Sequence, residues 1–107
     1  MTTIYADNAA TTAMSPAALA AMTAALQDNY ANVSSQHRMG QRAAAALLNA
    51  RRQIAAALGA DAGEIYFTSG GTEADNWALM SAARAGAREG KRHIVTSAIE
   101  HHAVLNT

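Results

Sequence analysis

The apolar positions of this chain recur every three or four residues in three stretches, which is the spacing of one face of an α-helix. The first stretch follows Ser15 and Pro16, a pair that favours a helix start, with the serine as N-cap and the proline at the first helical position. We expect a short amphipathic helix that ends near residue 27 or 28. Its packed face consists of Leu19, Met22 and Leu26.

The second stretch predicts the longest helix of the chain, over about residues 36–58. Ser34 or Ser35 can cap its start, and Gly59 is the type of residue that commonly ends a helix. We expect this helix to bury one stripe of side chains. The stripe consists of Ala43, Leu47, Ala50, Ile54 and Leu58.

The third helical stretch lies between two short runs rich in β-branched and aromatic residues, at positions 64–68 and 92–97. Each run predicts a strand, and the helix between them reaches to about residue 87. A strand, a helix and a strand in this order form the crossover that joins parallel strands. We therefore expect an α/β fold that is rich in helices, with parallel strands and covering helices.

Residues 68–76, with the sequence TSGGTEADN, join the first run to this helix. Gly70 and Gly71 allow positive φ and a close approach to a ligand, while Thr72 is a good N-cap and Asp75 completes a pattern like a capping box. The first amides of such a helix point outward, so they can hold a phosphate or a carboxylate. The alternative is a tight turn between a strand and a helix, without a ligand.

Known phosphate motifs narrow the type of site. The segment has neither the G-x-x-x-x-G-K-[ST] pattern of a P-loop nor the G-x-G-x-x-G pattern of a dinucleotide site. The remaining possibility is a phosphate held by backbone amides and by one hydroxyl group.

Composition and charge restrict the partners. Eight basic and eight acidic residues cancel over 107 positions, so no basic surface is expected for nucleic acid or for an anionic membrane. No apolar run approaches the roughly 18 residues of a membrane span, and the start of the chain has no basic leader. We expect one cytoplasmic segment with a core of small side chains, since alanine dominates the apolar half of the residues.

The histidines at positions 93, 101 and 102 are the residue types that could hold zinc. They lack a regular ligand spacing, and the chain contains no cysteine that could supply a thiolate. We therefore expect no metal site.

Four blocks of the chain carry a family resemblance. They are residues 7–12 (DNAATT), 32–40 (NVSSQHRMG), 68–76 (TSGGTEADN) and 97–105 (SAIEHHAVL). In order and spacing these blocks resemble the amino-terminal part of NifS/IscS-like cysteine desulfurases. Those enzymes are relatives of the class V aminotransferases and belong to fold type I of the enzymes that use pyridoxal 5′-phosphate (PLP). The resemblance covers essentially the whole chain.

The resemblance implies roles for particular residues. The backbone N–H of Gly71 and the hydroxyl of Thr72 would bind the PLP phosphate. His101 would stack on the pyridine ring and could assist proton transfer, although without the family context a capping or surface histidine is the simpler interpretation. Asn8 would lie near the substrate, within an extended arm over about residues 1–15. Residues 16–107 would then form helices and the start of the large, PLP-binding domain.

The resemblance also implies an activity for the intact enzyme, which converts L-cysteine to L-alanine and an enzyme-bound persulfide. That sulfur supplies iron–sulfur clusters through an acceptor or scaffold protein, and the enzyme is a homodimer. Such chemistry needs a lysine that holds PLP covalently and a cysteine that accepts sulfur. The chain has no cysteine, and its one lysine, Lys91, lies at an expected exposed turn. We therefore expect these 107 residues to be an incomplete amino-terminal segment without activity.

Two alternatives stay open. The chain could belong to another class V enzyme, such as a selenocysteine lyase or an aminotransferase, which residues outside these 107 would distinguish. It could also be a non-catalytic binding or dimerisation module that keeps only the anion site.

Overall fold

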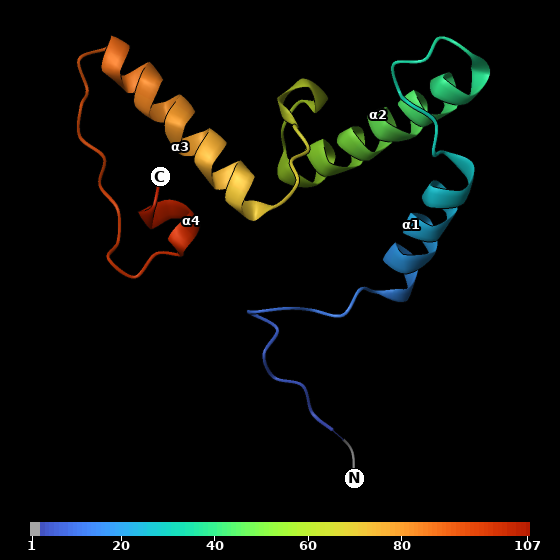
Figure 1. The fold of residues 1–107 in the computed structure, drawn as a ribbon, viewed down its shortest axis with the longest axis horizontal. Helices are drawn as coiled ribbons and strands as arrows, with labels where there is room; N and C mark the ends of the chain where they lie inside the picture. The colour runs from blue at the N-terminus through green and yellow to red at the C-terminus, as the bar shows by residue number, and fades with distance from the viewer. Residues whose placement is uncertain (1–2) are drawn as a thin grey trace. The chain divides into compact units, whose positions relative to one another are not determined.

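The computed structural model describes residues 3–107, and all the regular structure in that range is helical (Figure 1). The chain divides into two compact units, Met1–Ile65 and Tyr66–Thr107. The elements in order are α1 (Pro16–Asp28), α2 (Arg38–Leu58), the short 3₁₀ helix η1 (Ala62–Glu64), α3 (Gly71–Arg88) and α4 (His102–Leu105). The first two residues of the expected arm lie outside the described residues.

The predicted parallel strands are the main correction to the expected α/β fold. Glu64 closes η1, and residues 65–68 and 91–97 form neither a helix nor a strand. A parallel strand is stable only with hydrogen-bonded neighbours and with covered faces. Two short runs in 107 residues do not supply these, so the helix-rich part of the prediction holds and the sheet does not form.

In the first unit, α1 has the predicted boundaries. The Ser15 hydroxyl accepts from the Ala18 N–H at 3.2 Å, and Pro16 occupies the first turn. The expected packing of its apolar stripe is wrong, because α1 contacts no other helix of the described chain and buries none of its residues. Leu19, Met22 and Leu26 are each at least half exposed.

The second helix, α2, packs against η1 and buries Gly40, Ala43 and Ala55. Its predicted end is confirmed: Gly59 has a φ of 67°, and the Ala60 N–H reaches the Ala55 carbonyl at 2.9 Å. Of the predicted stripe, Ala43 is buried, whereas Ile54 and Leu58 are 38% and 70% exposed. The buried face therefore follows the smallest side chains.

The start of α2 differs from the prediction. His37, and neither of the preceding serines, is the N-cap, and its Nδ1 accepts from the Gly40 N–H at 3.4 Å. The loop before it folds back on the helix, with the Asn32 carbonyl accepting from the Ser35 N–H at 3.0 Å.

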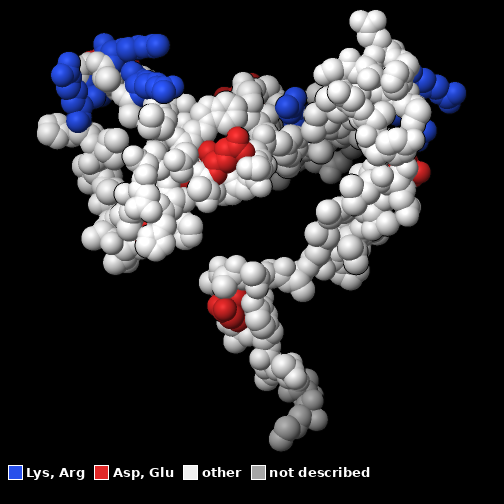
Figure 2. Space-filling view, viewed as in Figure 1, with Lys and Arg blue, Asp and Glu red and all other residues white. Residues whose placement is uncertain are grey.

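In the second unit, α3 packs against α4, and Ala103 is its buried residue. The predicted end of α3 is confirmed by a left-handed Gly90, with a φ of 77°, and by the Lys91 N–H bonding the Gly86 carbonyl at 2.9 Å. Lys and Arg side chains gather around this end of the helix (Figure 2), where they complement the negative end of its dipole.

Both units have small cores. The buried apolar residues of the described chain are Ala43, Ala55 and Ala103. Large apolar side chains such as Trp77, Ile94 and Val95 are 50%, 65% and 98% exposed. Trp77 packs on the Tyr66 ring, with the centroids 5.4 Å apart. The helices are therefore set largely by local hydrogen bonds and caps.

Candidate anion-binding site at the start of α3

The first turn of α3 presents unpaired backbone donors. Gly70 is the N-cap and has no side chain to cap the helix, and the first intrahelical bond runs from the Ala74 N–H to the Gly70 carbonyl at 3.2 Å. The N–H groups of Gly71 and Thr72 precede that bond, so they have no acceptor inside the helix. Together with the helix dipole, these donors favour an anion.

The conformation of the glycine pair differs from the prediction. Gly70 has φ 170° and ψ 179°, which is extended backbone, and the positive-φ glycines of the described chain are Gly59 and Gly90. A Cβ added to Gly70 or Gly71 would meet no atom within 4 Å. The two glycines therefore border open space, which is the condition for a ligand to approach the backbone.

The predicted capping by Thr72 and Asp75 is also wrong, because Thr72 lies inside the helix. Instead, the Glu73 carboxylate accepts from the Ser69 N–H at 2.6 Å and from the Ser69 hydroxyl at 2.7 Å. Both bonds lower the pKa of Glu73, and the bond from the Ser69 backbone N–H has the larger effect. With Gly70 as N-cap, Glu73 is the third helical residue, the usual place for a carboxylate that reaches back, and this was the missed signal.

A pocket of about 350 Å³ lies beside this turn and brings two predicted site residues together. Thr72 comes from the start of α3, and His101 directly precedes α4. The remaining residues that line the pocket are Asn76, His102, Ala103, Asn106 and Thr107. Gly71, the third predicted cofactor contact, is not among the lining residues, but residues from two of the four family-like blocks meet here.

His101 has a defined structural place. It is the N-cap of α4, and its Nδ1 accepts from the Ala103 N–H at 3.1 Å. A ring nitrogen that accepts a hydrogen bond carries no proton, so the proton of the neutral ring is on Nε2. The ring of His102 is 6.2 Å away between centroids, and it lines the same pocket. The capping role and the place in the pocket therefore belong to the same side chain.

The sequence predicted no role for Asn76 in the site. Its Nδ2 donates to the Thr72 carbonyl at 2.9 Å and to the Ala103 carbonyl at 3.0 Å, and so joins α3 to α4. The available signal was its position one helical turn after Thr72, on the same face of the helix.

Asn8 belongs to the first unit. Its turn is held locally: the Thr12 hydroxyl donates to the Asn8 carbonyl at 3.1 Å, and the Ala10 N–H bonds the Asp7 carbonyl at 3.1 Å. These contacts define a polar turn and leave the expected substrate contact of Asn8 as a prediction.

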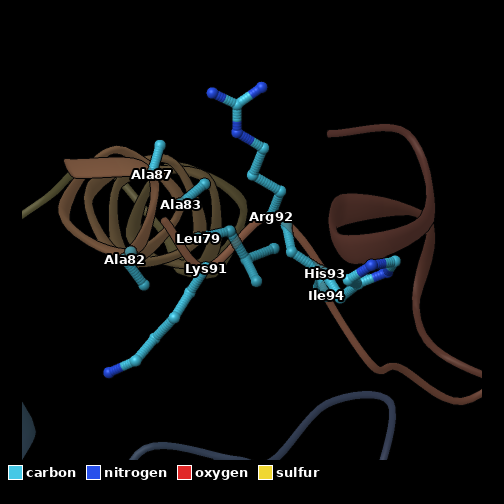
Figure 3. Close-up of a pocket in the computed structure, with 9 residues that line it drawn as sticks. Leu79, Ala82, Ala83, Ala87, Lys91, Arg92, His93 and Ile94 are labelled. Carbon is cyan, nitrogen blue, oxygen red and sulfur yellow. The ribbon is translucent and has the colours of Figure 1, made fainter. Parts of the chain in front are cut away.

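A second, larger pocket of about 620 Å³ lies between the last turns of α3 and residues 91–94. Figure 3 shows Leu79 and Ala83 on its helical side, with the charged ends of Lys91 and Arg92 extending away from the helix. The Lys91 side chain is 74% exposed and pairs with Glu89 at 2.6 Å. The prediction that Lys91 is a solvated charge is confirmed, and none of the predicted site residues lines this pocket.

Two features are absent from residues 3–107. No three His, Asp or Glu side chains in that range lie close enough together to hold a metal ion. No helix there combines the length and the apolar character needed to cross a membrane.

Comparison with known proteins adds the family. Residues 4–107 match the family described as aminotransferase class V. The chain is 49% identical over 104 residues to "Cysteine desulfurase IscS" of Methanosarcina thermophila, covering 97% of this chain and 26% of that protein. It is 49% identical over 106 residues to "Cysteine desulfurase" of Trichormus azollae, covering 99% and 26%. It is 47% identical over 104 residues to "NifS/IcsS protein homolog" of Lactobacillus delbrueckii subsp. bulgaricus, covering 97% and 27%.

The chain thus spans about a quarter of the length of the curated relatives that it matches. No solved structure matches it. Enzymes of the matched family use PLP, and the match runs through both sides of the pocket that holds Thr72 and His101. The chain therefore belongs to the class V aminotransferase family.

Proposed function

We propose that these 107 residues are the part of a PLP-dependent cysteine desulfurase that receives the phosphate and one ring face of the cofactor. The observation that carries the proposal is the pocket shared by Thr72 and His101, which are 29 positions apart in the sequence. Identity of 49% to proteins named cysteine desulfurase supports the choice of reaction. The whole enzyme would convert L-cysteine to L-alanine and an enzyme-bound persulfide, as a sulfur source for iron–sulfur clusters.

The residues present fit a phosphate. Two outward N–H groups, at Gly71 and Thr72, and the Thr72 hydroxyl supply neutral donors at the positive end of a helix of 18 residues. The open space beside Gly70 and Gly71 gives phosphate oxygens access to the backbone. Glu73 is turned toward Ser69 by its two hydrogen bonds, so its carboxylate does not occupy the N–H groups of Gly71 and Thr72.

His101 supplies the ring contact of the proposed site. Its imidazole is flat and is fixed at Nδ1 by the Ala103 N–H, which leaves Nε2 as the nitrogen that carries the exchangeable proton. When bound, PLP provides the electron sink that allows bonds at the substrate's α-carbon to be broken. Beside such a cofactor, His101 would cover one ring face and hold or release a proton at Nε2.

The remaining chemistry comes from residues outside these 107. The chain has no cysteine to accept sulfur, and its single lysine is the exposed Lys91, paired with Glu89. We include in the proposal L-cysteine as substrate, a sulfur-accepting or scaffold protein as partner and a homodimer as the intact form. The arm over residues 1–15, with Asn8, would lie near the substrate in that form.

Pyridoxamine 5′-phosphate tests the proposed site directly. It has the ring and phosphate of PLP but no aldehyde, so it cannot react with Lys91 or with the amino terminus. Titration of the ¹⁵N-labelled chain should shift the amide signals of Gly71 and Thr72 and the ring signals of His101. Pyridoxamine, which lacks the phosphate, should leave the two amides unchanged at the same concentrations.

The matched variants are Thr72→Ala and Thr23→Ala. Thr23 is also a helical threonine, but it lies on α1 and donates to its own helix at the Leu19 carbonyl. Thr72→Ala should weaken binding of pyridoxamine 5′-phosphate about tenfold or more, the effect of losing one hydrogen bond to a charged group, whereas Thr23→Ala should not. Equal binding of the phosphorylated and unphosphorylated compounds would overturn the proposal.

A further inference from the structure

We propose that Asn76 is a positioning residue that sets the ring of His101 beside the start of α3. The inference rests on the proposed function, because it concerns the same pocket. Asn76 lies on α3, one helical turn after Thr72, and it lines the pocket without being one of the predicted cofactor contacts.

The amide group of Asn76 makes two hydrogen bonds in different directions. Its Nδ2 donates to the Thr72 carbonyl on its own helix at 2.9 Å and to the Ala103 carbonyl, 27 positions away, at 3.0 Å. The first bond fixes the amide on the α3 surface. The second ties the start of α4 to that surface. A primary amide has two N–H donors, so one nitrogen can serve both carbonyls.

Ala103 transmits this restraint to His101. Ala103 is only 7% exposed, and its N–H donates to the His101 Nδ1 at 3.1 Å. Ala103 is therefore held through both of its backbone groups, its carbonyl accepting from Asn76 and its N–H donating to His101. The direction of the imidazole ring follows from where α3 holds Ala103.

The helix after His101 is too short to supply this order alone. The four residues of α4 fall far below the roughly 12 residues that an isolated helix needs in water. Within α4 and the residues beside it, the Thr107 hydroxyl also bonds the Ala103 carbonyl, at 2.7 Å, but that bond comes from the same local segment. The bond from Asn76 is the one that connects this segment to α3.

The test compares three substitutions at one position in the full chain. Asn76→Ala removes both donors, Asn76→Asp keeps the shape but replaces the donors with acceptors, and Asn76→Gln keeps the amide on a longer stem. The control is Asp75→Ala, which removes the neighbouring exposed side chain of the same helical turn. Far-UV circular dichroism verifies that helix content is retained in each variant.

The first readout is the tautomer of His101, from the ¹⁵N shifts of its two ring nitrogens without any ligand. The unmodified chain and Asp75→Ala should show the Nε2–H form. Asn76→Ala and Asn76→Asp should shift both signals toward the averaged values of a free histidine, and Asn76→Gln should recover part of the difference. Unchanged His101 shifts in Asn76→Ala and Asn76→Asp, with helices intact, would overturn the inference.

The second readout distinguishes an effect on binding of the ring from an effect on binding of the phosphate. Asn76→Ala should weaken binding of pyridoxamine 5′-phosphate about fivefold, the effect of one neutral hydrogen bond, and binding of inorganic phosphate less than about twofold. Equal losses for both probes would contradict positioning of the ring. If the unmodified chain binds neither probe, the proposed function fails, and the tautomer readout alone decides the role of Asn76.

Discussion

The two longest helices, α2 and α3, each have a glycine in the first turn, but the surroundings of the two glycines differ completely. At the start of α2, a Cβ on Gly40 would overlap the Ser35 carbonyl oxygen and lie 2.8 Å from that of Asn32. At the start of α3, a Cβ on Gly71 would meet nothing within 4 Å. One glycine is required by the protein's own backbone, whereas the other borders open space.

The capping of the two helices shows the same contrast between an enclosed and an open helix start. The start of α2 is closed by the chain itself, since His37 accepts from the Gly40 N–H and the loop over residues 32–35 lies against the helix. The start of α3 has a glycine N-cap, no side-chain cap and a pocket beside it. The comparison shows that a glycine at a helix start marks a possible ligand site only when the structure leaves its donors accessible.

The largest expected effect is that of Gly40→Ala. The added methyl group must displace backbone atoms of the loop, so we expect a loss of about 2 kcal/mol in the free energy of unfolding. Urea unfolding followed by far-UV circular dichroism measures it. The control is Gly63→Ala in η1, where an added Cβ also meets nothing within 4 Å. Equal stability of the two variants would show that the loop does not pack on α2.

The cap of α2 should contribute less. We expect His37→Ala to lower the free energy of unfolding by about 0.5 to 1 kcal/mol, near the low end for an N-cap, because the bond to the Gly40 N–H is long at 3.4 Å. His93→Ala, in the exposed segment after α3, is the control and should have no effect. A loss of the same size in both variants would refute a specific cap.

Gly71→Ala should change stability by less than about 0.5 kcal/mol, because the new methyl group meets no atom and helical φ suits alanine. The same unfolding measurement, placed beside Gly40→Ala, gives the contrast between the two helix starts. A loss at Gly71 as large as that at Gly40 would mean that the space beside α3 is filled by the chain.

The smallest effect is a pH dependence confined to the turn before α3. The Glu73 pKa is lowered by its bonds from Ser69, so these bonds are complete above the ordinary glutamate pKa of about 4.3. They are lost as the pH falls through the lower pKa of the folded chain. The amide signal of Ser69 should report this transition in an NMR titration. In Glu73→Gln that transition should be absent, and its persistence would assign it to another group.

The sequence predicted a local feature well where the physical properties of a single residue type determine that feature. Ser15 and Pro16 predicted the start of α1, and Gly59 predicted the end of α2, because these residue types supply the required cap or the left-handed backbone at low cost. It failed where the outcome depended on distant partners. Leu19 and Leu58 have the spacing of packed residues and are exposed.

The candidate site was predictable in part. Gly71, Thr72 and His101 could be named from family-like blocks, but the blocks do not show which atoms meet. The roles of Glu73 and Asn76 depended on moving the start of α3 to Gly70 and on bringing Ala103 against the helix. Neither is visible in local sequence, since a capping serine or threonine is normally a better candidate than a glycine.

The sequence by itself therefore determined the presence of the helices, the C-terminal ends of α2 and α3, and the family of the chain. These depend on backbone geometry within a few residues, or on blocks of residues in a fixed order. Only the tertiary structure decided that Gly40 is enclosed, that Gly71 is open, and that Thr72, Asn76 and His101 share a pocket. Enclosure and shared pockets depend on atoms brought together from distant positions, and a pattern along the chain does not contain those distances.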